Sequence, residues 1–283
     1  MATITADKPV LPKKKPSFQL DLASSSLVGL TVIATGAILV LVGVVLWLSF
    51  TEGTPGDPVL QYTLEHYPSL FLDGFTYRVL WNTALFSLTT LATSFLLAIP
   101  IAWLMERTDF PGKPIIFTLM TTALLIPSFA VALGWVFLLH PKIGMVNQAL
   151  VALLGLSDAP FDISNIFAMG VVEGMNLTPL SFVMIAVVLR SMDPALEEAA
   201  AISGAKPWQA VFRVTARVLL PGLLAAGIYV AMIGFAAFDV PAILGLTRRI
   251  FTFSTYVFWV LTPSEGAPEY GSVATLSVIM VAL

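Results

Sequence analysis

The stretch EEAAAISGAKPWQAVFRV, residues 197–214, is a polar, helix-favouring segment between two long apolar runs. Asp193 stands just before it as a helix N-cap, and the two glutamates that open it place negative charge near the positive end of a helix dipole. Alanines favour helix until Gly204, a residue that permits a turn, and a second short helix begins at Pro207. The stretch therefore predicts a hairpin of two short helices.

The composition around this segment is that of a membrane protein. Hydrophobic residues make up 58% of the 283 residues and charged residues 11%, against about a quarter charged in soluble domains. The chain has no cysteine, which excludes disulfides, iron-sulfur clusters and thiolate zinc sites. The sequence also lacks a phosphate-binding loop, because Gly112-Lys113 is followed by Pro114 and Arg107 stands where the first glycine is required. We therefore expect no catalytic residues and no nucleotide hydrolysis by this chain itself.

Apolar runs long enough to cross a bilayer, about 20 residues each, divide the rest of the chain. Residues 1–26 are polar and contain several prolines, and they are expected to form a disordered cytoplasmic tail. Residues 27–50 are expected to be the first transmembrane helix, because this run is too long for the core of a signal peptide. The later runs are Val79–Met105, Pro114–His140, Ile166–Leu189, Val218–Leu244 and one that opens near Gly271. The predicted fold is an all-α polytopic membrane protein with about six transmembrane helices.

The distribution of basic residues sets the expected orientation. With a cytoplasmic N-terminus, the loop at residues 191–217 lies on the cytoplasmic side. The segments then expected outside hold few of the 14 Lys and Arg residues, as the positive-inside rule requires. Those outside are Arg78, Lys142, Arg248 and Arg249. The last run stops at Leu283, short of a full span, so we expect a truncated sixth helix or the front part of a longer polypeptide.

Two carboxylates fall within the apolar runs, where charged residues are costly enough to be functional candidates. Glu173 lies about 10 Å from the outer end of the fourth run, at 1.5 Å per residue, and Asp239 lies near the outer face in the fifth. Both are predicted to line the outer part of a cavity, and Asn176 is a further candidate for contact with cargo. The alternatives are that Asp239 caps a helix end and that Glu173 makes a structural hydrogen bond.

The polar hairpin also carries a motif. Glu198-Ala199-Ala200 is followed after three residues by Gly204 and after nine more by Val214. This spacing resembles the EAA motif of type I (MetI-like) binding-protein-dependent ABC transporter permeases. The resemblance implies a coupling loop, residues 191–217, that docks on a separate ATP-binding subunit. The implied docking residues are Glu197, Glu198, Ala199, Ala200, Gly204, Ala205, Pro207 and Trp208.

The motif departs from the family pattern at its end, where Ala216-Arg217 stands in place of the usual Leu-Pro and a Leu-Pro pair recurs at Leu220-Pro221. The kink that the family has there is therefore expected about one turn later. The resemblance covers about residues 78–283, which we take as the transmembrane core. Within it, FDVPAILG at 238–245 and PEYG at 268–271 are similar to permeases of the ferric-iron uptake group.

This resemblance implies a multi-pass permease of the bacterial inner membrane that imports a small solute, with ferric iron as the cargo. The implied partners are a dimer of ATP-binding subunits, a periplasmic binding protein, lipid, and a second permease half in the same polypeptide or in a dimer. Nucleic acid is not among them. No cofactor is expected in this chain and no fixed metal site, with ATP and Mg²⁺ on the partner subunit.

Other functions remain open at this level. The hairpin could be an ordinary amphipathic connector on the lipid headgroups. An ion-coupled secondary transporter or channel would use Glu173 and Asp239 to couple an ion gradient to transport, and would leave the hairpin unexplained. A membrane scaffold would need no cavity.

Overall fold

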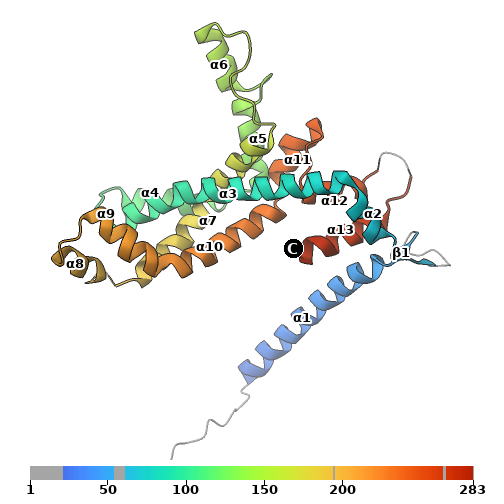
Figure 1. Ribbon diagram of the computed structural model, residues 1–283, viewed down its shortest axis with the longest axis horizontal. Helices are drawn as coiled ribbons and strands as arrows, with labels where there is room; N and C mark the ends of the chain where they lie inside the picture. Colours follow the sequence, from blue (N-terminus) through green and yellow to red (C-terminus); the bar gives the residue numbers. More distant parts are fainter. Residues whose placement is uncertain (1–21, 54–60, 194, 264–265, 283) are drawn as a thin grey trace, which may run out of the picture.

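The structure is a computed structural model that describes residues 22–53, 61–193, 195–263 and 266–282 (Figure 1). The first half comprises α1 (Leu22–Leu48), β1 (Thr51–Glu52), β2 (Gln61–Tyr62), α2 (His66–Leu72), α3 (Gly74–Arg107), α4 (Lys113–Ala123), α5 (Ser128–Leu139) and α6 (Met145–Leu154). The second half comprises α7 (Ile166–Ser191), α8 (Ala195–Ile202), α9 (Pro207–Ala210), a π-helix (Val211–Thr215), α10 (Ala216–Ala236), α11 (Asp239–Gly245), a 3-10 turn (Leu246–Arg248), α12 (Phe253–Leu261) and α13 (Tyr270–Ala282).

Three long helices, α3, α7 and α10, pack against one another at the centre of the molecule (Figure 1). The hairpin of α8 and α9 lies at one end of this bundle, and α2, α12 and α13 lie toward the other. Helix α1 runs away from the bundle and packs near its C-terminal end on α13 and β1. Its apolar side chains are exposed over most of its length, which suits a helix surrounded by lipid.

Small residues allow α3 and α7 to approach closely. A Cβ added at Gly174 would lie 2.5 Å from the Cβ of Thr93 and 2.7 Å from the carbonyl oxygen of Thr90. One turn earlier, a Cβ added at Gly170 would lie 2.7 Å from the Cβ of Thr89. Two glycines four residues apart on one helix face are a common device for close helix packing in membranes. The same interface is reinforced by a hydrogen bond of 2.6 Å between the buried hydroxyls of Ser94 and Ser181.

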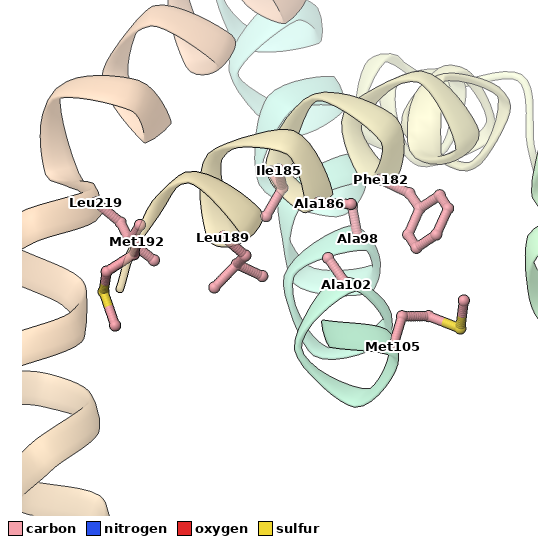
Figure 2. Packing of buried hydrophobic residues seen from close by; sticks show 9 residues of the cluster. All are labelled: Ala98, Ala102, Met105, Phe182, Ile185, Ala186, Leu189, Met192 and Leu219. Atoms are coloured by element: carbon pink, nitrogen blue, oxygen red, sulfur yellow. The ribbon is translucent and has the colours of Figure 1, made fainter. Parts of the chain in front are cut away.

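Between this interface and the hairpin, an apolar cluster joins all three central helices. Figure 2 shows nine of its side chains, which come from α3, α7, α10 and, for Met192, the position just after α7. They are Ala98, Ala102, Met105, Phe182, Ile185, Ala186, Leu189, Met192 and Leu219. Because a close-packed interior transmits strain rather than absorbing it, the three helices are mechanically connected here.

The predicted all-α membrane fold agrees with the structure. Within the described residues, four helices are long and apolar enough to cross a membrane, and a fifth span results if α4 and α5 are taken as one broken segment. The last predicted run corresponds to the described helix α13. Residues 22–26 of the expected tail belong to α1, because the apolar run extends its helix toward the N-terminus, and the remainder of the tail lies outside the described residues.

Two predicted spans are interrupted in the structure. The expected run Pro114–His140 is bent by 103° between α4 and α5, where Pro127 has an extended backbone (ψ 135°). Proline lacks the N-H that a continuous helix would use and also restricts the residue before it. The expected run Val218–Leu244 breaks after Ala236 for a similar reason, because Pro241 offers no N-H to the carbonyl of Ala237. Asp239 therefore opens α11 instead of lying inside a span.

Candidate functional site

The first candidate region is the α8–α9 hairpin, which forms as the sequence predicts. The side chain of Asp193 accepts a hydrogen bond of 2.9 Å from the backbone N-H of Ala195 and so caps the start of α8. At the other end Gly204 has φ +81°. The N-H of Gly204 donates to the carbonyl of Ala201 and the N-H of Ala205 to the carbonyl of Ala200, each at 3.0 Å. This pairing is the Schellman arrangement of a helix C-terminus. Pro194 lies outside the described residues.

The predicted docking residues divide between an outer and an inner side of this hairpin. Glu198, Ala199, Gly204 and Trp208 are exposed, while Ala200 and Ala205 are half-buried. Nothing is described of the Pro207 side chain. Two further apolar residues, Ile202 and Phe212, are exposed on the same segment although the motif does not include them. Large apolar side chains in a polar segment are the sequence signal that would have identified them.

Glu197 differs from the other predicted docking residues because its side chain points inward. Its Oε1 accepts a hydrogen bond of 3.2 Å from Nε of Arg107, at the end of α3, and one of 2.9 Å from the Thr215 hydroxyl in the π-helix. Nη2 of Arg107 also donates to the carbonyls of Leu189 and Met192, at 3.1 Å and 3.5 Å. We call these five residues the Arg107 cluster. No sequence pattern predicts this cluster, since Arg107 lies 90 positions before Glu197 in the chain.

The second candidate region is a cavity of about 350 Å³ between α5, α7, α10 and α11, which we call the acidic cavity. Its lining residues are Ser128, Glu173, Asn176, Leu177, Ile233, Ala236, Ala237, Phe238 and Asp239. All three residues predicted from sequence to face a pathway therefore meet in one place. Among the described lining residues none is Lys, Arg or His, so Glu173 and Asp239 share the cavity without a basic residue in its lining.

Within this cavity the two acids have different surroundings. Glu173 is only 4% exposed, and its Oε2 has no hydrogen-bond partner among the described residues. Burying a charged group without a partner is costly, which marks this side chain as unusual. Asp239 is better satisfied, because its Oδ2 accepts a hydrogen bond from the hydroxyl of Ser128.

The Ser128–Asp239 contact connects the two interruptions. Ser128 opens α5 after the first break, and Asp239 opens α11 after the second, so the bond joins segments 111 residues apart in the chain. Negative charge in the first turn of a helix is favoured by the helix dipole, which agrees with the helix-end alternative for Asp239. Ser128 was not predicted as a site residue, because a lone serine in an apolar run gives no signal.

Comparison with known proteins matches both regions to transport proteins. The family described as "Binding-protein-dependent transport system inner membrane component" matches residues 98–283, which include the hairpin and the acidic cavity. A permease protein of Salmonella typhi, named for 2-aminoethylphosphonate transport, is 30% identical over 151 residues, 52% of this chain and 51% of the relative. The molybdenum transport system permease protein of Escherichia coli K12 is 28% identical over 149 residues, 51% of this chain and 62% of the relative. The chain thus spans about half the length of the first of these relatives.

Solved structures agree on the fold. A bacterial alginate ABC transporter, in complex with its alginate-bound periplasmic protein, superposes with a TM-score of 0.74 at 19% identity. The superposition covers 93% of this chain and 90% of the transporter chain. The MetNI methionine ABC transporter, in inward facing conformations, gives a TM-score of 0.52 at 17% identity and covers 76% of this chain and 90% of the other. At such identities the likeness concerns the fold alone.

Proposed function

Because this chain belongs to the family of binding-protein-dependent transport system inner membrane components, we propose that it is the membrane-spanning permease subunit of an ATP-driven importer. The chain supplies the helices, the cavity and the docking hairpin. A dimer of separate subunits binds ATP and Mg²⁺ and hydrolyses the nucleotide. A periplasmic binding protein delivers the cargo, and a second permease half, in the same polypeptide or as a dimer partner, completes the pathway. The N-terminus lies in the cytoplasm.

The acidic cavity is the observation that carries this proposal. It lies where two apolar stretches are interrupted, at the 103° bend before α5 and at the gap between α10 and α11. Irregular backbone at membrane depth is tolerated where it lines a cavity, and transporters commonly bind their solutes at such interrupted helices. Two carboxylates, an amide and a hydroxyl around this cavity suit a passing polar solute better than a packed core would.

The charge of the cavity supports a cationic cargo, and ferric iron is the specific cargo we propose. Two acids without a basic lining residue attract a cation and repel an anion. Ferric iron is a hard cation that prefers oxygen ligands, which the side chains of Ser128, Glu173, Asn176 and Asp239 all offer. The resemblance of residues 238–245 to ferric-iron permeases supports the same cargo. Relatives are named for other solutes, so the cargo requires a direct test.

The test is uptake of radiolabelled ferric iron by vesicles that hold the complete complex of permease, ATP-binding subunits and binding protein. We expect uptake to require ATP and to be lost in Gly204→Asp. We expect Glu173→Gln to lower it about tenfold, or about 1.4 kcal/mol, because the amide removes one of the two negative charges that attract the cation. Glu106→Gln is the matched control, because Glu106 is a carboxylate outside the cavity that pairs with Arg190.

Each contrary result has its own meaning. ATP-dependent uptake that Gly204→Asp leaves unchanged would contradict the proposed docking role of the hairpin. Uptake driven by an ion gradient without ATP would establish the secondary transporter instead. A complex that hydrolyses ATP in response to its binding protein but moves no ferric iron would overturn the cargo and leave the importer in place.

A further inference from the structure

Helix α3 is not adjacent to the α8–α9 hairpin in the sequence, yet it packs along α7 and α10, the two helices that flank the hairpin. The hairpin is joined through the chain to α7 on one side and, by way of the π-helix, to α10 on the other. Any displacement of the hairpin therefore reaches α7 and α10 directly. It reaches α3 through side-chain contacts. One of these is the ion pair between Arg107, on α3, and Glu197, on the hairpin.

The contacts of Arg107 are those of a fixed connector. Its side chain is 10% exposed and that of Glu197 is 23% exposed, so water screens this pair much less than a surface pair. The guanidinium also donates to the carbonyl of Met192 and to that of Leu189, which the N-H of Met192 contacts as well, at the C-terminal end of α7 where a cation is favoured. One planar group thus holds α8, the end of α7 and the end of α3 in a single geometry.

The π-helix between the hairpin and α10 also contacts this ion pair. Val211–Thr215 forms a π-helical turn between the hairpin and α10, a conformation that is rare and often found at functional sites. The Thr215 hydroxyl donates to the same Glu197 oxygen that Arg107 contacts, at 2.9 Å. The irregular turn is thereby tied to α8 and α3 at one point, so that hairpin and bundle keep their relative position.

We propose that Arg107 is a positioning residue that ties α3 to the hairpin through Glu197, so that α3, α7 and α10 move together when a nucleotide-binding partner displaces the hairpin. This inference rests on the proposed importer function. It assigns Glu197 to transmission within the chain and leaves docking to the exposed Glu198, its sequence neighbour. The apolar cluster of Figure 2 then carries the movement along the bundle toward the acidic cavity.

A neighbouring ion pair provides a matched control. Nε of Arg190, on α7, contacts Oε1 of Glu106, on α3, at 2.8 Å. This pair has the same chemistry but joins α3 to α7 and not to the hairpin, since neither residue contacts the hairpin in the described contacts, and the Arg190 side chain is 60% exposed. If Arg107 served only to hold α3 against α7, removing Arg190 would have a similar kind of effect.

The experiment uses the complete complex in lipid vesicles and needs no known cargo. The chain contains no cysteine, so Ala236→Cys places a single reporter on the acidic cavity. The rate at which a maleimide labels this reporter is measured with and without a non-hydrolysable ATP analogue. In the otherwise unchanged chain we expect the analogue to change the rate. With Arg107→Gln or Glu197→Gln added, we expect the change to shrink about fivefold or more, while the ATP-binding subunits still co-purify.

Three further variants complete the test. Arg190→Gln should leave the nucleotide response intact. The double variant Arg107→Gln/Glu197→Gln should be no worse than either single one, because both remove the same contact. Arg107→Lys, which keeps the charge but not the planar fork, should fold and recover part of the response, which guards against a variant that merely fails to fold.

The outcomes separate the two levels of inference. A full nucleotide response in folded Arg107→Gln would overturn the assignment, and so would loss of the ATP-binding subunits from that variant, since Arg107 would then act in docking. If the reporter chain with Arg107 intact shows no nucleotide response, the proposed importer function itself fails, and this assignment fails with it.

Discussion

The two ends of α7 differ in how the carboxylates near them are paired. At the end next to the hairpin, two carboxylates pair with arginines: Glu197 contacts Arg107 and Glu106 contacts Arg190. Toward the opposite end, Glu173 is more buried than either and faces a cavity whose described lining holds a second acid and no base. The difference shows that burial alone does not define the role of a carboxylate.

What matters is which acceptor positions remain free. The Glu197 carboxylate already receives hydrogen bonds from Arg107 and Thr215, so it serves to hold parts of the chain together. Glu173 has an oxygen without a partner among the described residues, so it keeps an acceptor position available on the cavity. A carboxylate that is already paired can hold segments of the chain together, whereas a carboxylate with a free oxygen can bind a ligand.

The largest expected effect comes from breaking the packing on which both regions depend. Gly174→Leu forces a side chain against Thr93 and the carbonyl oxygen of Thr90, so we expect a loss of stability of about 3 kcal/mol and little folded protein in the membrane. Thermal unfolding of the purified permease measures this. Gly134→Leu is the control, because a Cβ at Gly134 meets nothing within 4 Å. Equal stability of the two variants would contradict the close α3–α7 approach.

A smaller effect should separate the cavity from the hairpin. Ser128→Ala removes the hydroxyl that donates to Asp239, and we expect it to lower the free energy of unfolding by about 1.5 kcal/mol. Affinity for the ATP-binding subunits should not change. Ser157→Ala provides the comparison, since Ser157 makes an exposed bond to Asp158 that should contribute little. If Ser128→Ala instead weakened the affinity, the two regions would not be separable.

The smallest expected effect concerns the hairpin alone. Gly204→Ala places a side chain at φ +81° without any steric contact, so its cost is conformational, about 1 kcal/mol. Because this strain acts on the docking surface, we expect affinity for the ATP-binding subunits to fall about fivefold, as measured by titration. Gly155→Ala imposes a similar strain at φ +64° after α6. It should destabilise the chain equally and leave that affinity unchanged, and a fall in affinity there would contradict the prediction.

Much of the local structure was predictable because it depends on neighbours in the sequence. The cap at Asp193 and the turn at Gly204 each follow from residues within a few positions. The interruptions were harder to predict. The prolines at 127, 179 and 241 look alike in the sequence, yet α7 continues through Pro179. In contrast, one apolar run breaks just before α5, which follows Pro127, and another breaks just before α11, which contains Pro241. Whether a proline breaks a span depends on which neighbours satisfy the freed carbonyl.

The sequence by itself determined the membrane class, the apolar helices and the polar hairpin, because hydrophobicity and helix capping act over short distances. Only the tertiary structure decided that Glu197 turns inward while Glu198 faces out, and that Ser128, Glu173 and Asp239 share one cavity. These outcomes depend on contacts between distant segments, such as Arg107 with Glu197, 90 positions apart, or Ser128 with Asp239, 111 positions apart. Helix propensity and apolar periodicity carry no information about such contacts, which are set by how α3, α7 and α10 pack.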